Sequence, residues 1–342
     1  MTALERYRAA LAGEEVDHLP CHPITMMFAS HLIGRPFRDY VMDHRVMVEG
    51  QLRMVEAFGV DYVATISDPC RETHDLGAHC TYLDDEAPSN EDRYALLKDK
   101  TLLASLQFPD LLGGGRMHDR IQAVAKLRAA VGPEMSVMGW VEGPIALAVD
   151  LRGMQDLMLD TVDDPSFVAD LFEFCVNLEI EFARLQVQAG ADSIGIGDAA
   201  ASLISLRTYQ SLVFPYEQRL AAAIKALGPT VRLHVCGNTT RLAPDFERLG
   251  LDLVDIDYLA DLPTAAAALQ KTAIMGNLEP ARWLLRDTPD GVYRTLAQNH
   301  AVVGPRFVVG AGCEIPRGAP HDNVRAMVRY AREHGRRERA AG

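Results

Sequence analysis

Three residues with soft ligand atoms stand out because of their type and their spacing. His234 and Cys236 are two residues apart in VRLHVCGNTT, residues 231–240, and Cys313 follows a separate apolar run in RFVVGAGCEIPRGAP. Imidazole nitrogen and thiolate sulfur both bind Zn²⁺, and three protein ligands with one open position are typical of catalytic zinc. Taken alone, His234 and Cys236 are also compatible with a core strand that carries two incidental residues. The addition of Cys313 favours a metal site.

Short apolar runs alternate with amphipathic helical segments along the chain, and this alternation predicts how the three residues come together. Amphipathic segments separate the runs, and two of them, residues 164–190 and 206–228, close on a glycine suited to a helix C-cap. The runs lie at residues 18–25, 61–66, 135–141, 192–198, 231–236, 253–257, 272–276 and 306–311. Eight such runs predict an α/β fold, a (β/α)8 TIM barrel. We expect extra elements after the second strand, in residues 67–134, and an N-terminal helical extension.

This barrel would gather polar side chains at the C-terminal ends of its strands, where barrel enzymes hold their active sites. Residues two apart in a strand share a face, so His234 and Cys236 point the same way at the end of the fifth strand. Cys313 comes just past the eighth strand. The candidate catalytic residues at this rim are Glu142 and Asp198, and the candidate cofactor-binding residues are Asn277 and Tyr258. Asp198 and Asn277 are equally suited to cap the helix that follows each of them.

Composition and charge bound the class of protein. The chain has 342 residues, of which 48% are apolar and 24% charged, and no Gly-, Pro- or Ser-rich linker divides it, so we expect one domain over residues 1–342. A net charge of −13 argues against nucleic acid or an anionic membrane as a partner. No apolar stretch approaches the roughly 20 residues of a membrane span. The six scattered cysteines fit a reducing cytoplasm.

Motifs spread along nearly the whole chain carry a resemblance to a known family. They are ERYRAALAGEEVDHLP, EAFGVDYV, EGPIALAVDLRG, QAGADSIGIGDAAAS, LHVCGNTT, GNLEP and GAGCEIPRGAPHDNVRAMV. The chain resembles the uroporphyrinogen decarboxylase superfamily and, within it, the zinc-dependent cobalamin methyltransferases. The most specific motifs are HVCG and GCEIP, and the resemblance implies that His234, Cys236 and Cys313 are zinc ligands. It further implies methyl transfer between a small substrate and the cobalt of a corrinoid, with zinc acting as a Lewis acid.

The N-terminal stretch separates two branches of this superfamily. The decarboxylase branch holds porphyrin carboxylates with an arginine-rich segment, whereas this chain has CHPITMMFASHLIGRPF, with apolar Met26 and Phe28. This difference argues against decarboxylation of a porphyrin-like polyacid, which stays the alternative function, and a non-catalytic barrel with a structural zinc is a second alternative. Thiol-specific methyltransferases commonly have a neutral residue before Gly-Pro, where this chain has Glu142. This difference favours demethylation of a methoxylated compound over methylation of a thiol.

The remaining expectations concern the pocket and the partners. The predicted substrate pocket includes His22, and an apolar wall would be formed by Met26, Met27, Phe28 and Trp140, although the wall residues also suit barrel packing. Glu142 is the candidate to handle a proton or to fill the fourth zinc position. The implied cofactors are Zn²⁺ and cobalamin, which a corrinoid protein would carry, since no Asp-x-His-x-x-Gly signature occurs in this chain. The other partner is a small-molecule methyl donor or acceptor, and a homodimer is compatible with the sequence.

Overall fold

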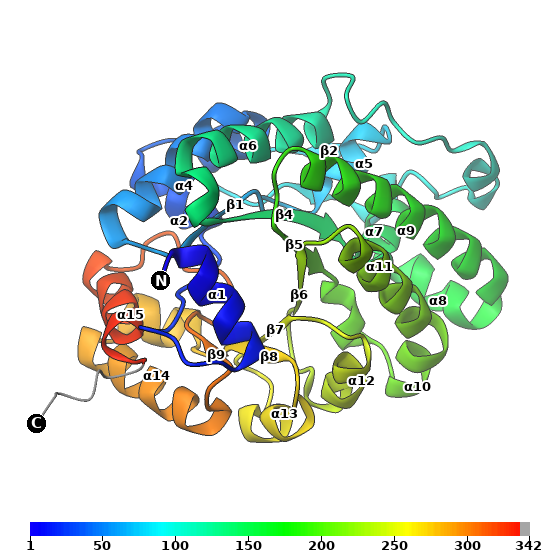
Figure 1. Cartoon of the computed structure of the whole chain (residues 1–342). Helices are drawn as coiled ribbons and strands as arrows, with labels where there is room; N and C mark the ends of the chain where they lie inside the picture. Colours follow the sequence, from blue (N-terminus) through cyan, green and yellow to red (C-terminus); the bar gives the residue numbers. More distant parts are fainter. Residues whose placement is uncertain (336–342) are drawn as a thin grey trace, which may run out of the picture.

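Seven parallel strands form the wall of a barrel in the computed structural model, which describes residues 1–335 (Figure 1). Neighbours pair in the order β1-β4-β5-β6-β7-β8-β9. The strands are β1 (Tyr62–Ala64), β4 (Ser136–Glu142), β5 (Ser193–Gly197), β6 (Thr230–Val235), β7 (Leu253–Ile256), β8 (Ala273–Gly276) and β9 (Phe307–Val308). Nearly all of their residues are buried, because helices cover the outer face and side chains fill the interior.

The eighth side of the barrel is an irregular segment rather than a strand. The run at residues 18–25 was predicted as the first strand, but it forms a single parallel bridge between Cys21 and Val309. Pro20 and Pro23 lack N–H donors, which explains why the run does not continue as a ladder. Backbone hydrogen bonds still close the sheet, from His22 N–H to Val309 O at 2.9 Å and from Asp61 N–H to Cys21 O at 3.3 Å. The predicted barrel is confirmed, with this correction to its first strand.

Helices surround the strands (Figure 1). The segment predicted as a helix at residues 164–190 is α9, and Gly190 follows it with φ 114°, a conformation that favours glycine. The segment at 206–228 divides into α10, a π turn and α11. The helices after β4 are α7 (Pro144–Arg152), α8 (Met154–Asp163), α9 (Pro165–Gln188), α10 (Leu206–Thr208), α11 (Phe214–Ala226), α12 (Ala243–Arg248), α13 (Leu262–Ala268), α14 (Pro289–Val303) and α15 (His321–Glu333). Short turns are η4 (Ala199–Leu203), η5 (Tyr209–Val213), η6 (Thr240–Leu242) and η7 (Pro280–Arg286).

Both predicted additions to the barrel are present. The N-terminal extension is α1 (Ala3–Ala12), which begins with a capping box between Thr2 and Glu5. Three more helices precede β1: α2 (Met26–Leu32), α3 (Phe37–Met42) and α4 (His44–Phe58). Between β1 and β4 lie α5 (Cys70–Asp75), the antiparallel pair β2 (Cys80–Thr81) and β3 (Ser89–Asn90), the turns η1 (Asp92–Tyr94), η2 (Lys100–Ser105) and η3 (Gly132–Glu134), and α6 (Arg116–Val131).

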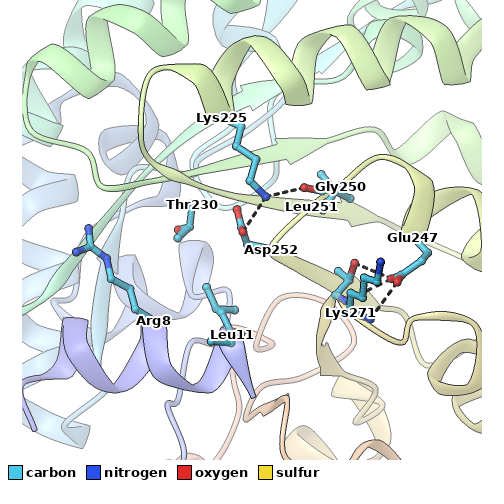
Figure 2. A pocket seen from close by; sticks show the side chains of 11 residues that line it. Arg8, Leu11, Lys225, Thr230, Glu247, Gly250, Leu251, Asp252 and Lys271 are labelled. Atoms are coloured by element: carbon cyan, nitrogen blue, oxygen red, sulfur yellow. Dashed lines mark hydrogen bonds and ion pairs between the residues drawn. The ribbon is translucent and has the colours of Figure 1, made fainter. Parts of the chain in front are cut away.

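Helix α1 lies across the N-terminal end of the strands. There it borders a surface pocket of about 400 Å³, shown in Figure 2, between Arg8 and Leu11 of α1 and the start of β6 at Thr230. The Lys225 ammonium donates to Gly250 O at 2.7 Å and to Asp252 Oδ1 at 3.0 Å. This pocket is at the opposite end of β6 from His234, so it is separate from the predicted site.

Two general expectations can be compared with the described residues. No helix within residues 1–335 is long and apolar enough to cross a membrane. All six cysteines lie within these residues and are free thiols.

Glycines in β5 make room for the one tryptophan in the barrel wall. Trp140 on β4 is 3% exposed, and its indole ring covers Gly195 on the neighbouring strand. A Cβ at Gly195 would lie 2.2 Å from Trp140 Cε3, which is far inside van der Waals contact. The sequence SIGIG therefore fixes where the indole lies in the interior.

We predict that Gly195→Ala destabilises the fold by about 1–3 kcal/mol, because the added methyl group must displace the Trp140 ring from a packed interior. Urea unfolding followed by tryptophan fluorescence measures this change. The control is Gly318→Ala, where a Cβ would meet only Leu285 at 3.6 Å and should change stability little. Equal stability of the Gly195→Ala variant and the wild type would contradict this description of the packing.

Candidate active site

Strand register places several polar residues in one row at the C-terminal end of the barrel. Glu142 pairs with Gly197, Gly197 with His234, and His234 with Asp255. Paired residues of neighbouring strands point to the same face of a sheet, and Arg232, two residues before His234, contacts the interior residue Met275. The row therefore faces the barrel interior, at the end where the sequence predicted chemistry.

The three soft ligand atoms lie at the corners of one triangle. His234 Nε2 is 3.2 Å from Cys236 Sγ and 3.8 Å from Cys313 Sγ, and the two sulfur atoms are 3.9 Å apart. Tetrahedral zinc with bonds of about 2.3 Å to sulfur and 2.0 Å to nitrogen would separate the ligand atoms by about 3.5–3.8 Å. The geometry fits such an ion. Cys236 is the first residue after β6 rather than part of it, a small correction to the predicted strand.

Asp255 orients the histidine of this triangle. Its Oδ2 atom lies 3.1 Å from His234 Nδ1, and it also accepts hydrogen bonds from Arg232 at 2.7–2.9 Å. A carboxylate accepts, so Nδ1 carries the proton and the Nε2 lone pair is left for a metal. Burial would raise the pKa of Asp255, but the neighbouring Arg232 and His234 lower it.

Asp255 and Arg232 were not singled out from the sequence. The available signal was a charged residue inside each of two buried strands, Asp255 in LVDI and Arg232 in TVRLHV. Arg232 also has the same spacing to His234 as Cys236 has, which places it on the interior face.

Cys313 is positioned by the loop that follows β9. Glu314 accepts a hydrogen bond from the backbone N–H of Met27 at the start of α2, which ties this loop to the N-terminal segment. Gly312 is needed for a close approach, because a Cβ there would lie 2.6 Å from Tyr258 N. Burial raises the pKa of Glu314 to about 8. Glu314 is a second positioning residue that the sequence did not indicate.

The surroundings of Cys313 favour its thiolate form. A hydrogen bond from the Cys236 thiol and the nearby His234 imidazole together lower the pKa of Cys313 to about 4, although burial opposes them. The thiolate is the form of cysteine that binds metal. The electrostatics of the cluster therefore agree with its geometry.

Glu142 is buried at the top of β4 and paired with an arginine. Its Oε1 atom accepts from Arg71 Nη2 at 2.8 Å, and Arg71 Nε lies 2.8 Å from Glu72 Oε1. Arg71 also donates to the backbone oxygen of Asp68 at 2.7 Å. Burial raises the pKa of Glu142 against the opposing effect of Arg71. Glu142 is not part of the three-ligand cluster, so its expected roles in proton handling and as a fourth ligand stay predictions.

The other predicted rim residues lie apart from the cluster. Asp198 Oδ1 accepts from Ala146 N–H at 2.7 Å at the start of α7, a helix earlier in the chain, and its side chain does not cap η4, the turn that follows it. Burial, followed by the neighbouring Glu217, raises the pKa of Asp198. Asn277 Nδ2 donates to Ala260 O at 3.1 Å, while Tyr258 is 41% exposed on the rim. The catalytic role of Asp198 and the cofactor roles of Asn277 and Tyr258 stay predictions.

The predicted pocket residues divide between the interior and the helical layer. The Trp140 ring centroid is 6.5 Å from that of His234, and Met26 packs on the same interior cluster as Trp140. His22 is stacked between Tyr7 and Tyr62 in the interior, where burial lowers its pKa to about 3.

Phe28 lies outside the barrel mouth. It is buried between Phe58 of α4 and His321 of α15. Helix α2 turns this side chain toward its helical neighbours, so the structure gives Phe28 the packing role.

The structure places three soft ligands at the C-terminal rim of a parallel barrel. This arrangement is typical of a barrel enzyme with a catalytic metal centre. The chain belongs to the uroporphyrinogen decarboxylase (URO-D) family, whose model matches residues 2–334. The resemblance that the sequence indicated is therefore confirmed.

Individual relatives place the chain beside methyltransferases of this family. It is 32% identical over 226 residues to methylcobamide:CoM methyltransferase MtbA of Methanosarcina mazei, which covers 65% of this chain and 66% of the relative. It is 25% identical to the methylated-thiol–coenzyme M methyltransferase of the same organism, over 97% of this chain and 90% of the relative. A solved methyltransferase structure from M. mazei superposes with a TM-score of 0.88 at 23% identity, covering 97% of this chain and 99% of that chain, which confirms the fold.

The buried acid Glu72 predicts a characteristic pH dependence of stability. Burial, with repulsion from Glu142, raises its pKa to about 8 in the folded protein although Arg71 opposes this, whereas an unfolded glutamate titrates near 4.3. The contribution of Glu72 to the free energy of unfolding is therefore fully present below about pH 4, and it is lost as the pH rises to about 8. We expect Glu72→Gln to gain stability relative to the wild type between about pH 5 and pH 9, measured by urea unfolding at several pH values.

The matched control for this series is Glu134→Gln. Glu134 is exposed at the other end of β4, so its substitution should leave the pH dependence unchanged. A stability difference between Glu72→Gln and the wild type that stays constant across the range would contradict a neutral, buried Glu72.

Proposed function

We propose that this protein is a zinc-dependent methyltransferase that moves a methyl group between a small substrate and the cobalt of a corrinoid. The observation that supports it most is the triangle of His234, Cys236 and Cys313, whose edges suit one tetrahedral ion. The names of the relatives, methylcobamide:CoM methyltransferase and methylated-thiol–coenzyme M methyltransferase, agree with this class of reaction. Cobalamin would be carried by a corrinoid protein as partner.

The residues of the cluster have separable tasks in this proposal. Zinc bound there would supply Lewis acidity toward the sulfur or oxygen atom from which, or to which, the methyl group moves. His234 would donate Nε2, held in place by Asp255, and Cys236 and Cys313 would supply two thiolates. The fourth coordination position of the zinc would be open to the substrate.

Glu142 is the proposed proton carrier. Methylation of a thiol releases one proton, and demethylation of an ether consumes one. Burial raises the pKa of Glu142, which suits a carboxyl group that exchanges a proton with a substrate, and Arg71 fixes its position with a hydrogen bond of 2.8 Å. We favour demethylation of a methoxylated or similar small compound, with Trp140 and Met26 as the apolar wall of its pocket.

Metal content tests the ligand set. We expect about one zinc per purified chain, and near-complete loss of zinc and of methyl transfer in His234→Ala and Cys313→Ser, because two ligands hold zinc far more weakly than three. Elemental analysis and the cobalamin absorbance change measure the two effects. His31→Ala, an exposed histidine on α2, is the control. If His234→Ala kept full zinc and full activity, the proposal would be wrong.

Removal of zinc separates a catalytic ion from a structural one. An open site at a barrel rim contributes little to folding, so a chelator should lower Tm by less than about 5 °C while methyl transfer stops. A structural zinc that contributes about 10 kcal/mol or more would instead collapse the fold on chelation. Thermal unfolding followed by circular dichroism, with and without chelator, distinguishes the two.

A further inference from the structure

Two thiols lie next to each other outside the candidate metal cluster. Cys70 is the first residue of α5 and is fully buried, whereas Cys80 begins β2 and is partly exposed (Figure 1). The Sγ atom of Cys80 lies 3.8 Å from the carbonyl oxygen of Cys70 and 3.8 Å from Thr73 Oγ1, so it rests against the first turn of α5. The thiols of Cys70 and Cys80 also hydrogen bond to each other. When protonated, Cys80 donates to Asn90 Oδ1 at 3.0 Å.

The surroundings of the pair divide the two thiols by reactivity. A hydrogen bond from the Cys70 thiol lowers the pKa of Cys80 to about 7, although burial opposes this effect. Thr73, Tyr82 and Arg116 add to the lowering. The hydrogen bond to Cys80, together with burial, raises the pKa of Cys70, so Cys70 stays a thiol. A cysteine that is accessible and readily ionised is the usual target of an oxidant, and this description fits Cys80.

A metal ion is the other ligand that two adjacent thiols could take. Among the described residues, 1–335, neither Cys70 nor Cys80 belongs to a group of three or more histidine, cysteine or acidic side chains close enough to share an ion. Protein zinc sites use three or four protein ligands, and this pair offers two. The arrangement therefore favours oxidation of the thiols over metal binding.

We propose that Cys80 and Cys70 form a reversible disulfide on exposure to hydrogen peroxide, with Cys80 as the thiol that attacks the peroxide and Cys70 as the thiol that resolves the product. The Cys80 thiolate attacks one peroxide oxygen, the O–O bond breaks, and the leaving hydroxide takes up the proton that Cys80 released. The product is a sulfenic acid at Cys80 and one molecule of water.

The second step closes the disulfide. The sulfur of Cys70 forms a bond to the sulfur of Cys80, and the sulfenic oxygen leaves with the Cys70 proton as a second molecule of water. The two thiols are thereby oxidised to one disulfide, and one peroxide is reduced to two molecules of water. The hydrogen bond that keeps Cys70 protonated ends when the Cys80 thiolate is consumed, which assists this step.

The position of the pair connects it with the candidate active site. The disulfide would join β2, in the excursion between β1 and β4, to α5. Arg71 follows Cys70 directly in α5, and its guanidinium donates to Glu142 Oε1 at 2.8 Å. Oxidation would therefore act on the segment that holds the candidate proton carrier.

Peptide mapping of the full-length protein tests the proposal. Reduced protein, freed of reductant, is treated with a several-fold excess of hydrogen peroxide, and its remaining thiols are alkylated before digestion. Trypsin cleaves after Arg71, which places Cys70 and Cys80 on separate peptides, residues 54–71 and 72–93. We expect mass spectrometry to find these two peptides joined in most chains and separated again after treatment with dithiothreitol. A bond between Cys236 and Cys313 would join other peptides and is counted separately.

Three variants fix the order of the steps. In Cys70→Ala the sulfenic acid at Cys80 is not resolved, so labelling of Cys80 by dimedone during peroxide treatment should rise at least about fivefold over the wild type. Cys80→Ser should give neither the joined peptides nor a label on Cys70. Cys175→Ala, at a buried cysteine of α9, is the matched control and should form the disulfide as the wild type does. Thermal unfolding verifies that each variant is folded.

Two results would overturn the inference. One is folded wild-type protein in which peroxide produces no peptide that joins Cys70 to Cys80. The other is a folded Cys70→Ala variant in which dimedone labels another cysteine outside the metal cluster ahead of Cys80. Neither measurement depends on methyl transfer, so the disulfide and the proposed function are tested separately.

Discussion

The carboxylate of Asp255 is the group on which the rest of the site depends. It is fully buried between Arg232 and His234, and it accepts hydrogen bonds from both. A buried arginine without its partner costs several kcal/mol, so the fold requires this carboxylate for stability. The same atom fixes the tautomer of His234 and directs its Nε2 atom toward Cys236 and Cys313. Asp255 therefore serves both the stability of the barrel interior and the orientation of the candidate metal ligand His234.

Glycines decide how the remaining interior space is used. In β5, Gly195 admits the Trp140 ring and Gly197 lets Trp140 Nε1 and Glu142 Oε2 lie close to the strand, while Gly312 allows the Cys313 loop to approach Tyr258. Larger residues at these positions would fill the barrel mouth or move the loop. The glycines, which have no side chain, therefore determine how closely the groups near the candidate metal ligands can pack.

Charge is distributed unevenly along the barrel axis. At the C-terminal end, buried carboxyl groups exceed the arginines that pair with them, and burial raises the pKa values of Glu72 and Glu142. At the N-terminal end, lysine and arginine side chains line an open pocket in contact with water, where charges are screened (Figure 2). Charges are therefore screened less at the end that holds the cysteines than at the open pocket of the N-terminal end.

The sequence by itself determined the barrel, its helical extension and the three soft ligands. Apolar periodicity depends on local spacing, and His-x-Cys spacing in a strand already places two ligands on one face. It did not reveal that residues 18–25 close the sheet by a single bridge, or that Phe28 packs between helices. Nor did it indicate Asp255, Arg71 and Glu314, because their roles arise from partners far away in the chain. Only the tertiary structure decided those contacts, since a buried charge takes its function from whichever group the fold places beside it.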